Sequence, residues 1–300
     1  MAQCHTIAKV NPFKDNSMRI CHSTSLTFGG GMRIWKMNGA GNAFAVFDAR
    51  ERAFAPTEAQ LREIAETMRA DQIMAIESDL RADAFLRFWN ADGSEVKACG
   101  NGTRAVAHLL LEESGKDEVR IQTEADLLKG ARAQGGLVSV DMGSPLLGWE
   151  DIPLSEKMDV RGVDVKIGPL DDPYLYKPAV VSMGNPHAVF FVENVDDYDI
   201  PAIGPLIEWH PTFPEGANVG FAQIIDRQTI RLRVWERGAG LTKACGTGAC
   251  AALVCAARAG KTDRKAKLIL DGGELIVEWS EATDHVIMTG PVELEESFTV

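Results

Sequence analysis

The sequence predicts an α+β protein built from two matching halves, and three observations support this fold class. Residues 86–89 and 98–102 recur, with few changes, as residues 232–235 and 244–248, at a constant offset of 146 residues. Short strand-like segments dominate the chain, and one apolar helical segment follows the cysteine of each copy. The strand, G-x-G-x-x-G and helix arrangement of a dinucleotide-binding sheet is absent from the sequence. Two pseudo-symmetric halves, each with one central helix, account for all three observations.

The first half is expected to contain several strands and two helices. Residues 57–69 have helical spacing, because Leu61, Ile64 and Met68 fall on one face. Residues 102–111 follow the first repeated cysteine and are apolar enough for a buried helix. The strands expected in this half are residues 33–37, 44–47, 84–89, 119–123 and 137–142.

The second half repeats this order of elements. Residues 151–177 are rich in Pro, Gly and Asp, and the join between the halves is expected at or just before them. An Ala-rich helix is expected at residues 246–259, after the second repeated cysteine. The strands expected here are residues 188–192, 230–235, 267–270, 275–278 and 286–288.

Residues 1–31 stand outside the repeat. They are polar, contain more basic than acidic residues and end in three glycines. We expect a disordered leader or an over-long start, with Met32 or Met18 opening the folded part. A transit peptide is the alternative interpretation of a basic, acid-poor segment of this kind.

The composition limits the classes of partner and the compartment. The chain has 300 residues, 45% of them hydrophobic, and a formal net charge of −12. An acidic chain is repelled by nucleic acid and by anionic membrane surfaces, so neither is expected as a partner. No apolar run reaches the roughly 18 residues of a membrane span. No secretory signal is visible, so we expect a cytoplasmic protein whose six cysteines are free thiols.

Each repeated cysteine, Cys99 or Cys245, precedes a Gly-x-Gly turn where a loop enters a helix. A helix N-terminus presents unpaired N–H groups and about half a positive charge, which favours a thiolate and binds carboxylates. Two such helix ends facing each other would hold one α-carboxylate and place one sulfur on each side of the α-carbon. This arrangement suits removal of a proton from one face of a carbon and its return to the other.

The remaining cysteines fit other roles. Cys250 and Cys255 lie five residues apart in the Ala-rich helix, on different faces, and are expected to be buried small apolar side chains. They do not converge with Cys245, and no Cys-x-x-Cys pair or His at ligand spacing accompanies them, so no metal site is expected. Cys4 and Cys21 have no counterpart in the second half and are not expected to be catalytic.

Polar residues near the repeated turns are candidate ligand contacts, although a single Asn in a loop is most often a turn residue. The halves differ at one informative position, because Glu236 stands 146 residues after Asn90. Glu236 and Arg237 suit recognition of an ammonium and a carboxylate at a second, non-reacting centre. His187, at the position matching Phe44, has two interpretations, a structural imidazole or a proton relay.

These motifs resemble those of the diaminopimelate epimerases, cofactor-independent enzymes of lysine and cell-wall precursor synthesis. The resemblance runs from about Met32 to the C-terminus. Residues 90–95 with 99–104 are similar to the family's first cysteine signature, and residues 236–238 with 244–249 are similar to the second. Residues 182–187 and 217–221 also resemble family motifs.

The resemblance implies a fold and a reaction. Each half would be a curved, mostly antiparallel sheet around a central helix, with a last strand near residues 288–295 returning to the first half. The expected domains are residues 32–145 plus about 290–300, and residues 146–289. The expected reaction is the interconversion of LL- and meso-2,6-diaminopimelate, a small amino-acid substrate, by two-cysteine proton transfer. No cofactor is expected, and homodimers are usual in the family.

The resemblance also assigns roles to individual residues. Cys99 and Cys245 would be the acid–base pair, and His187 and Glu236 would help to move the thiol protons. The backbone amides expected to hold the reacting carboxylate are those of Gly100, Asn101, Gly246 and Thr247. The residues expected to line the substrate pocket are Asn42, Gln72, Asn90, Asn185, Asn218, Glu236 and Arg237.

The sequence departs from the family pattern in two places. The first motif usually reads His-Gly-x-Gly-Asn-Asp-Phe, whereas this chain has Asn38 and Ala43 at the first and sixth positions. Before the second cysteine the family commonly has Glu-Thr, whereas this chain has Leu241 and Thr242. Neither departure removes a proposed acid, base or carboxylate anchor, so they bear on substrate preference and rate rather than on reaction type.

Two other functions fit parts of the sequence. A proline or hydroxyproline racemase of the same fold has the same thiol pair, but it has no need of the Glu236–Arg237 recognition pair. A thiol redox switch or an inactive binding protein would also use two close thiols. Proton exchange at the α-carbon of an amino acid distinguishes an enzyme from a binding protein.

Overall fold

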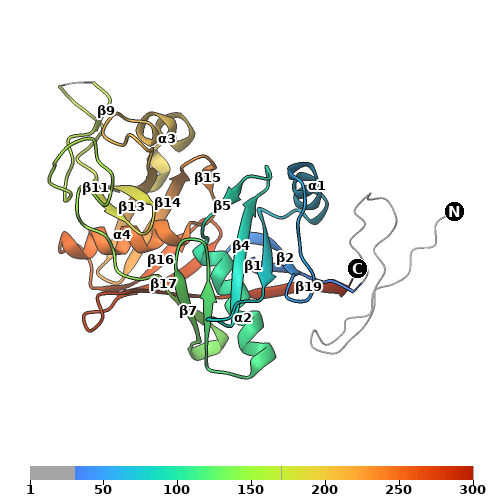
Figure 1. The fold of residues 1–300 in the computed structure, drawn as a ribbon. Coiled ribbons are helices and arrows are strands. Elements are labelled where there is room, and N and C mark those ends of the chain that lie inside the picture. The colour runs from blue at the N-terminus through green and yellow to red at the C-terminus, as the bar shows by residue number, and fades with distance from the viewer. Residues whose placement is uncertain (1–30, 170, 300) are drawn as a thin grey trace.

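The computed structural model describes residues 31–169 and 171–299. The expected leader therefore lies outside the described residues, apart from Gly31. Two lobes lie side by side, one containing helix α2 and the other containing helix α4 (Figure 1). Each helix packs its apolar side chains into the core of its own lobe.

The first lobe is formed mainly by residues 31–145. Helix α1 begins with a capping box, in which Thr57 and Gln60 satisfy each other's backbone N–H groups. The strands are β1 (Arg33–Gly39), β2 (Asn42–Asp48), β3 (Gln72–Glu77), β4 (Ala84–Asn90), β5 (Glu95–Val96), β6 (Glu118–Gln122), β7 (Leu127–Arg132) and β8 (Val138–Asp141). The helices are α1 (Glu58–Met68), α2 (Gly100–Ser114) and the short 3-10 helix η1 (Gln134–Gly136).

The second lobe repeats this set of elements. Its strands are β9 (Lys166–Ile167), β10 (Leu175–Tyr176), β11 (Ala179–Ser182), β12 (Pro186–Val192), β13 (Asn218–Asp226), β14 (Thr229–Glu236), β15 (Gly240–Thr242), β16 (Lys265–Leu270), β17 (Gly273–Trp279) and β18 (Val286–Gly290). Its helices are η2 (Val195–Asp197), α3 (Ile200–Glu208) and α4 (Gly246–Arg258). Within residues 31–169 and 171–299, no helix is long and apolar enough to cross a membrane.

Strand pairing demonstrates the pseudo-symmetry directly. In the first lobe β1–β2 is antiparallel, β2–β3 parallel, β3–β4 antiparallel, β4–β6 parallel, and β6–β7 and β7–β8 antiparallel. The second lobe has the same order and directions through β11, β12, β13, β14, β16, β17 and β18. The predicted fold class, two α+β halves with mostly antiparallel sheets around central helices, is confirmed.

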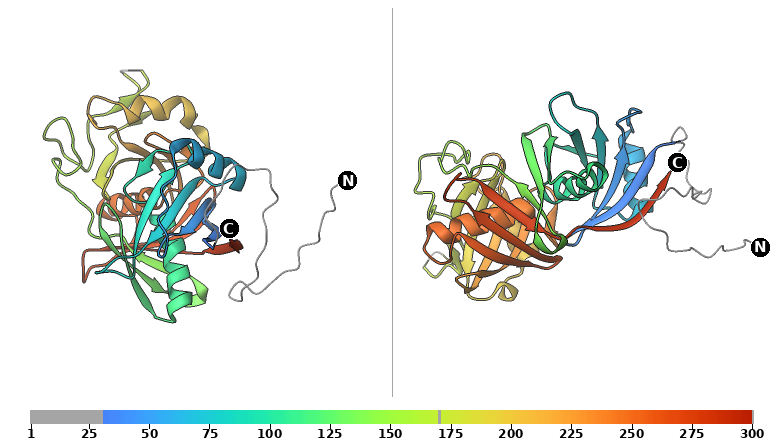
Figure 2. Two further views of the ribbon diagram at one scale, coloured as in Figure 1. Left: turned by 45° about the vertical axis from the view of Figure 1, so that its right-hand side comes forward. Right: turned by 90° about the horizontal axis from the view of Figure 1, so that it is seen from below.

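The lobes are joined by an exchange of segments. Strand β8 pairs antiparallel with β18, and β19 (Glu293–Thr299) then runs into the first lobe to pair with β1 (Figure 2). In the reciprocal direction, the chain after β8 reaches the second lobe, where Leu146 forms a bridge with Ser182 of β11. Of the domain boundaries that we propose, the one after residue 145 follows the end of β8, and the one after residue 289 lies one residue before the end of β18.

Every strand and helix expected from the sequence is present, with ends that differ by a few residues. Four substantial strands were missed, namely β3, β7, β11 and β13. Helix α3 was missed because Pro201 and Pro205 are atypical of a helix interior, although a proline is tolerated in the first turn, where its N–H would have no partner.

Candidate active site

Cys99 and Cys245 occupy the same structural position in the two lobes. Each is the N-cap of its helix, with extended backbone angles, and each sulfur accepts a hydrogen bond from the amide three residues later. The distances are 3.4 Å from Gly102 N to Cys99 Sγ and 3.3 Å from Gly248 N to Cys245 Sγ. The two preceding amides of each helix, the expected carboxylate anchors, lack intrahelical partners by helix geometry.

The two helix N-termini meet at one methionine. A Cβ added to Gly100, the first residue of α2, would lie 3.2 Å from Met288 Cε, and one added to Gly246, the first residue of α4, would lie 3.0 Å from Met288 Sδ. The Gly246 position is also 3.3 Å from Asn101 Oδ1 of the opposite lobe. The starts of both helices, and with them the two capping cysteines, therefore lie together at the junction of the lobes.

Burial dominates the acidity of both thiols. Desolvation raises the pKa of Cys99 to about 11 and the pKa of Cys245 well above its ordinary value. The Gly102 and Gly248 amides oppose this effect by hydrogen bonding to the sulfurs. The sequence-based expectation that the helix N-terminus lowers the thiol pKa is wrong for these buried sulfurs, because the loss of hydration outweighs the amides.

Glu236 couples directly to the second thiol. Its carboxylate accepts hydrogen bonds from the Thr242 hydroxyl and from the Cys245 thiol. Burial raises the pKa of Glu236, and these two hydrogen bonds act in the opposite direction. After burial, the negative charge of Glu236 also contributes to the raised pKa of both cysteines. One carboxylate thus acts electrostatically on the thiols of both lobes.

A chain of hydrogen bonds leads from His187 toward Cys245. His187 Nε2 lies 3.0 Å from Asn185 Oδ1, Asn185 Nδ2 donates to Thr247 Oγ1 at 3.4 Å, and Thr247 Oγ1 is 3.6 Å from Cys245 Sγ. His187 is fully buried and its Nδ1 has no hydrogen-bond partner. Burial, followed by the charge of Arg237, lowers the pKa of His187 to about 3. Any role of His187 at neutral pH therefore involves a neutral imidazole.

Asn218 and Arg237 lie beside this chain. Asn218 Nδ2 donates to the Pro186 carbonyl at 2.9 Å, and its Oδ1 accepts from the Arg237 backbone amide at 3.0 Å. The Arg237 guanidinium donates to the Glu215 carbonyl at 2.6 Å. The structure thus fixes Arg237 by its backbone and its side chain at the end of β14.

In the first lobe, the expected pocket residues form two groups. Asn101 Nδ2 donates to Asn42 Oδ1 at 2.7 Å, beside the first cysteine turn. Gln72 Nε2 donates to Asn90 Oδ1 at 3.1 Å, as a cross-strand pair of β3 and β4. The side chain of Asn90 forms its hydrogen bonds with Gln72 and Ser94 rather than with the cysteine turn.

The strand registers explain which positions correspond between lobes. Phe44 lies opposite Gln72 in the β2–β3 pair, and His187 lies opposite Asn218 in the β12–β13 pair. The predicted match of His187 with Phe44 is confirmed. Gln72 and Asn218 likewise match each other, so two of the pocket residues that the resemblance implies lie at one repeated position.

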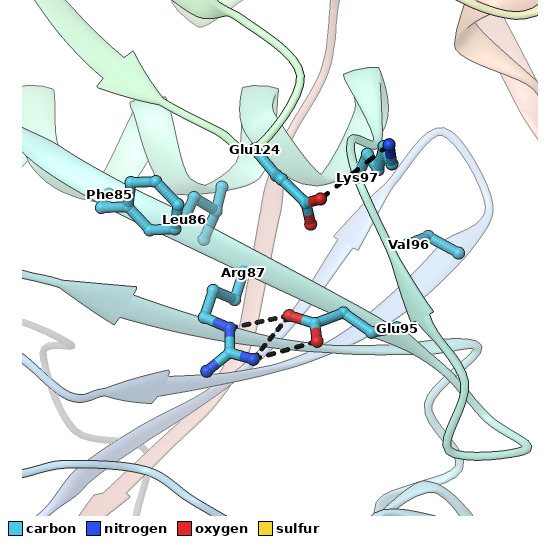
Figure 3. A pocket seen from close by; sticks show the side chains of 7 residues that line it. All are labelled: Phe85, Leu86, Arg87, Glu95, Val96, Lys97 and Glu124. Carbon is cyan, nitrogen blue, oxygen red and sulfur yellow. Dashed lines mark hydrogen bonds and ion pairs between the residues drawn. The ribbon is translucent and has the colours of Figure 1, made fainter.

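A surface pocket near the first cysteine turn does not contain the candidate site. It lies between β4, β5 and the loop before β7, and its charged groups neutralise one another in pairs (Figure 3). Arg87 contacts Glu95, and Lys97 contacts Glu124. The lining residues are Phe85, Leu86, Arg87, Glu95, Val96, Lys97 and Glu124.

Two residues at the site were not assigned a role from the sequence. Thr242 holds Glu236, and Arg104 donates from Nη1 to Asn101 Oδ1 at 2.7 Å. A signal for Arg104 was available, because it is the one charged residue among the apolar residues 102–111. Within the described residues, no group of His, Cys, Asp and Glu is arranged to hold a metal ion.

Solved structures share the two-lobe fold. A hydroxyproline epimerase from Agrobacterium vitis aligns with a TM-score of 0.60 at 16% identity, covering 92% of this chain and 94% of that chain. A PhzF-family phenazine biosynthesis protein from Enterococcus faecalis aligns with a TM-score of 0.63 at 14% identity, covering 90% and 99%. Such identities show the fold alone. They place the chain in the class of proteins with this two-lobed α+β fold.

The sequence comparisons define the family. The family model described as diaminopimelate epimerase matches residues 34–147 and 179–295. The diaminopimelate epimerase of Caulobacter vibrioides (strain NA1000 / CB15N) is 52% identical over 271 residues, 87% of this chain and 94% of that protein. The diaminopimelate epimerase of Phenylobacterium zucineum is 54% identical over 268 residues, 88% and 96%. The chain belongs to the diaminopimelate epimerase family.

Proposed function

We propose that this protein interconverts LL- and meso-2,6-diaminopimelate by proton transfer between Cys99 and Cys245. The observation that carries the proposal is the meeting of the two cysteine-capped helix N-termini at Met288. Family membership, with relatives named diaminopimelate epimerase at about half identity over most of the chain, supports the same substrate.

The proposed step balances in protons and charge. A thiolate at one cysteine removes the α-proton as the C–H bond breaks, and the electron pair passes into the α-carboxylate. The thiol at the other cysteine donates its proton to the opposite face of the carbon and becomes a thiolate. The paired helix N-termini stabilise the negative charge that develops on the carboxylate, because their N–H groups and dipoles are already oriented.

Glu236 and Arg237 are proposed to recognise the non-reacting end of the substrate. The first lobe has Asn90 where the second has Glu236, so this repeated position carries a charge in the second lobe only. Glu236 suits an ammonium group, and Arg237, held at the end of β14, suits a carboxylate. A substrate with two amino-acid centres uses both residues, whereas proline has no second centre to occupy them.

The proposal includes several properties of the enzyme in the cell. We propose that it needs no cofactor or metal, forms a homodimer, acts in the cytoplasm and supplies lysine and peptidoglycan precursor synthesis. Its partner in the site is a small amino acid, and nucleic acid and membranes are not proposed as partners. The acidic net charge of −12 supports the exclusion of polyanions.

The test is an isomer assay on the reduced protein. After dialysis against a chelator, the protein is incubated with LL-diaminopimelate, and the stereoisomers are separated by chiral chromatography. We expect the meso isomer to appear at full rate without additions. L-Proline and trans-4-hydroxy-L-proline are assayed in parallel. Turnover of proline in place of diaminopimelate, or dependence on pyridoxal phosphate or a metal ion, would refute the proposal.

A further inference from the structure

Arg104 is a buried cation without a carboxylate partner. It lies on α2, is 0% exposed, and is the largest fully buried side chain among the described residues. Its Nη1 donates to Asn101 Oδ1 at 2.7 Å and its Nε to the Pro291 carbonyl at 3.4 Å, whereas Nη2 has no hydrogen-bond partner. Burying a charge is strongly unfavourable unless an opposite charge compensates it. The position of this guanidinium therefore calls for a nearby anion.

The titratable groups that face Arg104 are thiols. The two groups whose anionic forms favour the charged guanidinium are Cys99, at the start of its own helix, and Cys250 on α4. Burial lowers the pKa of Arg104 to about 10, so the guanidinium is still charged at neutral pH. On Cys99, the positive charge of Arg104 favours the thiolate and offsets part of the larger, opposite effect of Glu236 from β14.

The two lobes differ at this position. Cys250 stands 146 residues after Arg104, at the offset that also separates Cys99 from Cys245. A guanidinium thus accompanies only the first thiol, while a carboxylate, Glu236, is hydrogen-bonded only to the second. Of the two capping cysteines, Arg104 therefore favours the thiolate of Cys99 alone, whereas Glu236 opposes the thiolates of both and is hydrogen-bonded only to Cys245.

We infer that Arg104 is a positioning residue that holds the Asn101 amide at the start of α2 and stabilises the Cys99 thiolate by its charge. The same amide donates to Asn42 Oδ1, so Arg104 anchors a line of hydrogen bonds that reaches the expected substrate pocket. It follows that Cys99 reaches its anionic form before Cys245, which shares its proton with Glu236. The role of Arg104 in turnover rests on the proposed function, but its effect on Cys99 does not.

The experiment compares three variants by thiol alkylation. Arg104→Met removes the charge and keeps the bulk, Arg104→Lys keeps the charge but loses the planar fork, and Cys250→Ala removes the other facing thiol. The rate of iodoacetamide alkylation is measured against pH, with peptide mass spectrometry quantifying Cys99 and Cys245 separately. Far-UV circular dichroism and thermal melting verify that each variant is folded.

In Arg104→Met, the midpoint of Cys99 alkylation is expected to rise by about one pH unit or more, because an opposite charge has been removed. At a fixed pH below the midpoint, alkylation of Cys99 then slows about tenfold, and alkylation of Cys245 stays unchanged. Cys250→Ala is expected to leave the Cys99 midpoint unchanged. Arg104→Lys is expected to keep the midpoint within about half a unit and to raise KM through the loosened Asn101.

A folded Arg104→Met protein with an unshifted Cys99 midpoint would overturn the inference. If Arg104→Met does not fold, a Cys99 midpoint that rises in Arg104→Lys by a full unit overturns it instead, since the charge is retained there. Alkylation needs no turnover, so the proposed function is judged separately. A wild-type protein that shows the Arg104 effect but does not epimerise diaminopimelate refutes only the proposed function.

Discussion

At the residue scale, the two capping cysteines have a structural and a chemical role that substitution separates. Cys99→Ser and Cys245→Ser keep an atom that accepts the helix amide, so the free energy of unfolding should change by less than about 1 kcal/mol. Steady-state assays should show kcat reduced by at least about 10²-fold, the lower range for loss of a general acid–base group. Cys250→Ala and Cys255→Ala are the controls and should retain turnover. Near-normal turnover in either serine variant contradicts the two-base proposal.

His187 gives a prediction about pH and stability. Its pKa is lowered to about 3 in the folded state, below the ordinary value of about 6.5 in the unfolded chain. Between these values the unfolded state binds more protons, so stability falls as the pH falls below about 6.5. His187→Phe, which copies Phe44 of the first lobe, removes this proton uptake.

Urea unfolding at pH 7 and pH 5 measures the effect. Between these pH values the wild-type protein should lose about 2 kcal/mol more stability than His187→Phe. Taking the difference between the two proteins removes the contributions of His108 and His210, whose pKa values are also lowered by burial. Equal losses in both proteins would show that His187 is not held neutral by the fold.

The sequence was most informative for residues that occur in both copies of the repeat. Cys99 and Cys245 were singled out because their flanking residues recur, and the structure places both at helix N-caps. The repeat does not reveal burial, so the direction of the thiol pKa shifts was predicted wrongly. Arg104 also escaped assignment, because its burial and its hydrogen bond to the Pro291 carbonyl arise only through the fold.

At the element scale, the turn between β1 and β2 is a contact between lobes. Gly41 has φ of 91°, and a Cβ there would lie 2.4 Å from the Cα of Gly272 in the β16–β17 turn. Gly184, its counterpart in the second lobe, has φ of 86° but no atom within 4 Å of its Cβ position. Comparing an alanine substitution at Gly41 with one at Gly184 therefore separates the cost of backbone strain from the cost of a clash between lobes.

Gly184→Ala should reduce the free energy of unfolding by about 1–2 kcal/mol, the strain of a left-handed residue. Gly41→Ala should add a clash of about 1–3 kcal/mol, because backbone atoms cannot move aside as a flexible side chain does. Gly41→Ala should also lower kcat/KM more than Gly184→Ala does, because the clash with Gly272 displaces the turn that carries Asn42. Chemical denaturation and steady-state kinetics of both variants test this. Equal effects of the two substitutions would show that the contact between lobes contributes nothing.

Helices and strands could be predicted from the sequence where the periodic pattern of apolar residues was long or where many β-branched residues occurred together. Helices α2 and α4 were expected from their apolar residues after the cysteine turns, and both exist with nearly the expected ends. Strand β13 was missed because Gly220 interrupts its apolar run, although its first five residues are buried and the strand pairs with β12 on one side and β14 on the other. Burial on both sides, rather than local propensity, makes this segment a strand.

At the scale of the whole molecule, two thiols at the junction of the lobes should make the enzyme sensitive to oxidation. Peroxide should inactivate it, and peptide mapping should find Cys99 linked to Cys245, because one crosslink removes both acid–base groups. Dithiothreitol should restore activity. Cys250→Ala and Cys255→Ala should behave as the wild type does. Recovery of activity without this crosslink would indicate another oxidised species.

The two-lobe architecture could be predicted because the repeated segments recur at a constant offset of 146 residues, about half the length of the chain. The exchange of segments between lobes could not be worked out from periodicity, since no residue of β19 is fully buried and the strand pairs with β1 only through the fold. The return of the last strand to the first lobe was expected from the resemblance to the diaminopimelate epimerase family. The family model and the relatives confirm that the chain belongs to this family.

The most direct test of the two-thiol proposal is proton NMR of LL-diaminopimelate with the reduced protein in D₂O. We predict loss of α-proton signal at the substrate as meso-diaminopimelate forms, with solvent deuterium in the product, and no exchange with Cys99→Ser or Cys245→Ser. Epimerisation that retains the original α-proton in the product, or exchange that continues in both serine variants, would contradict proton transfer between these two cysteines.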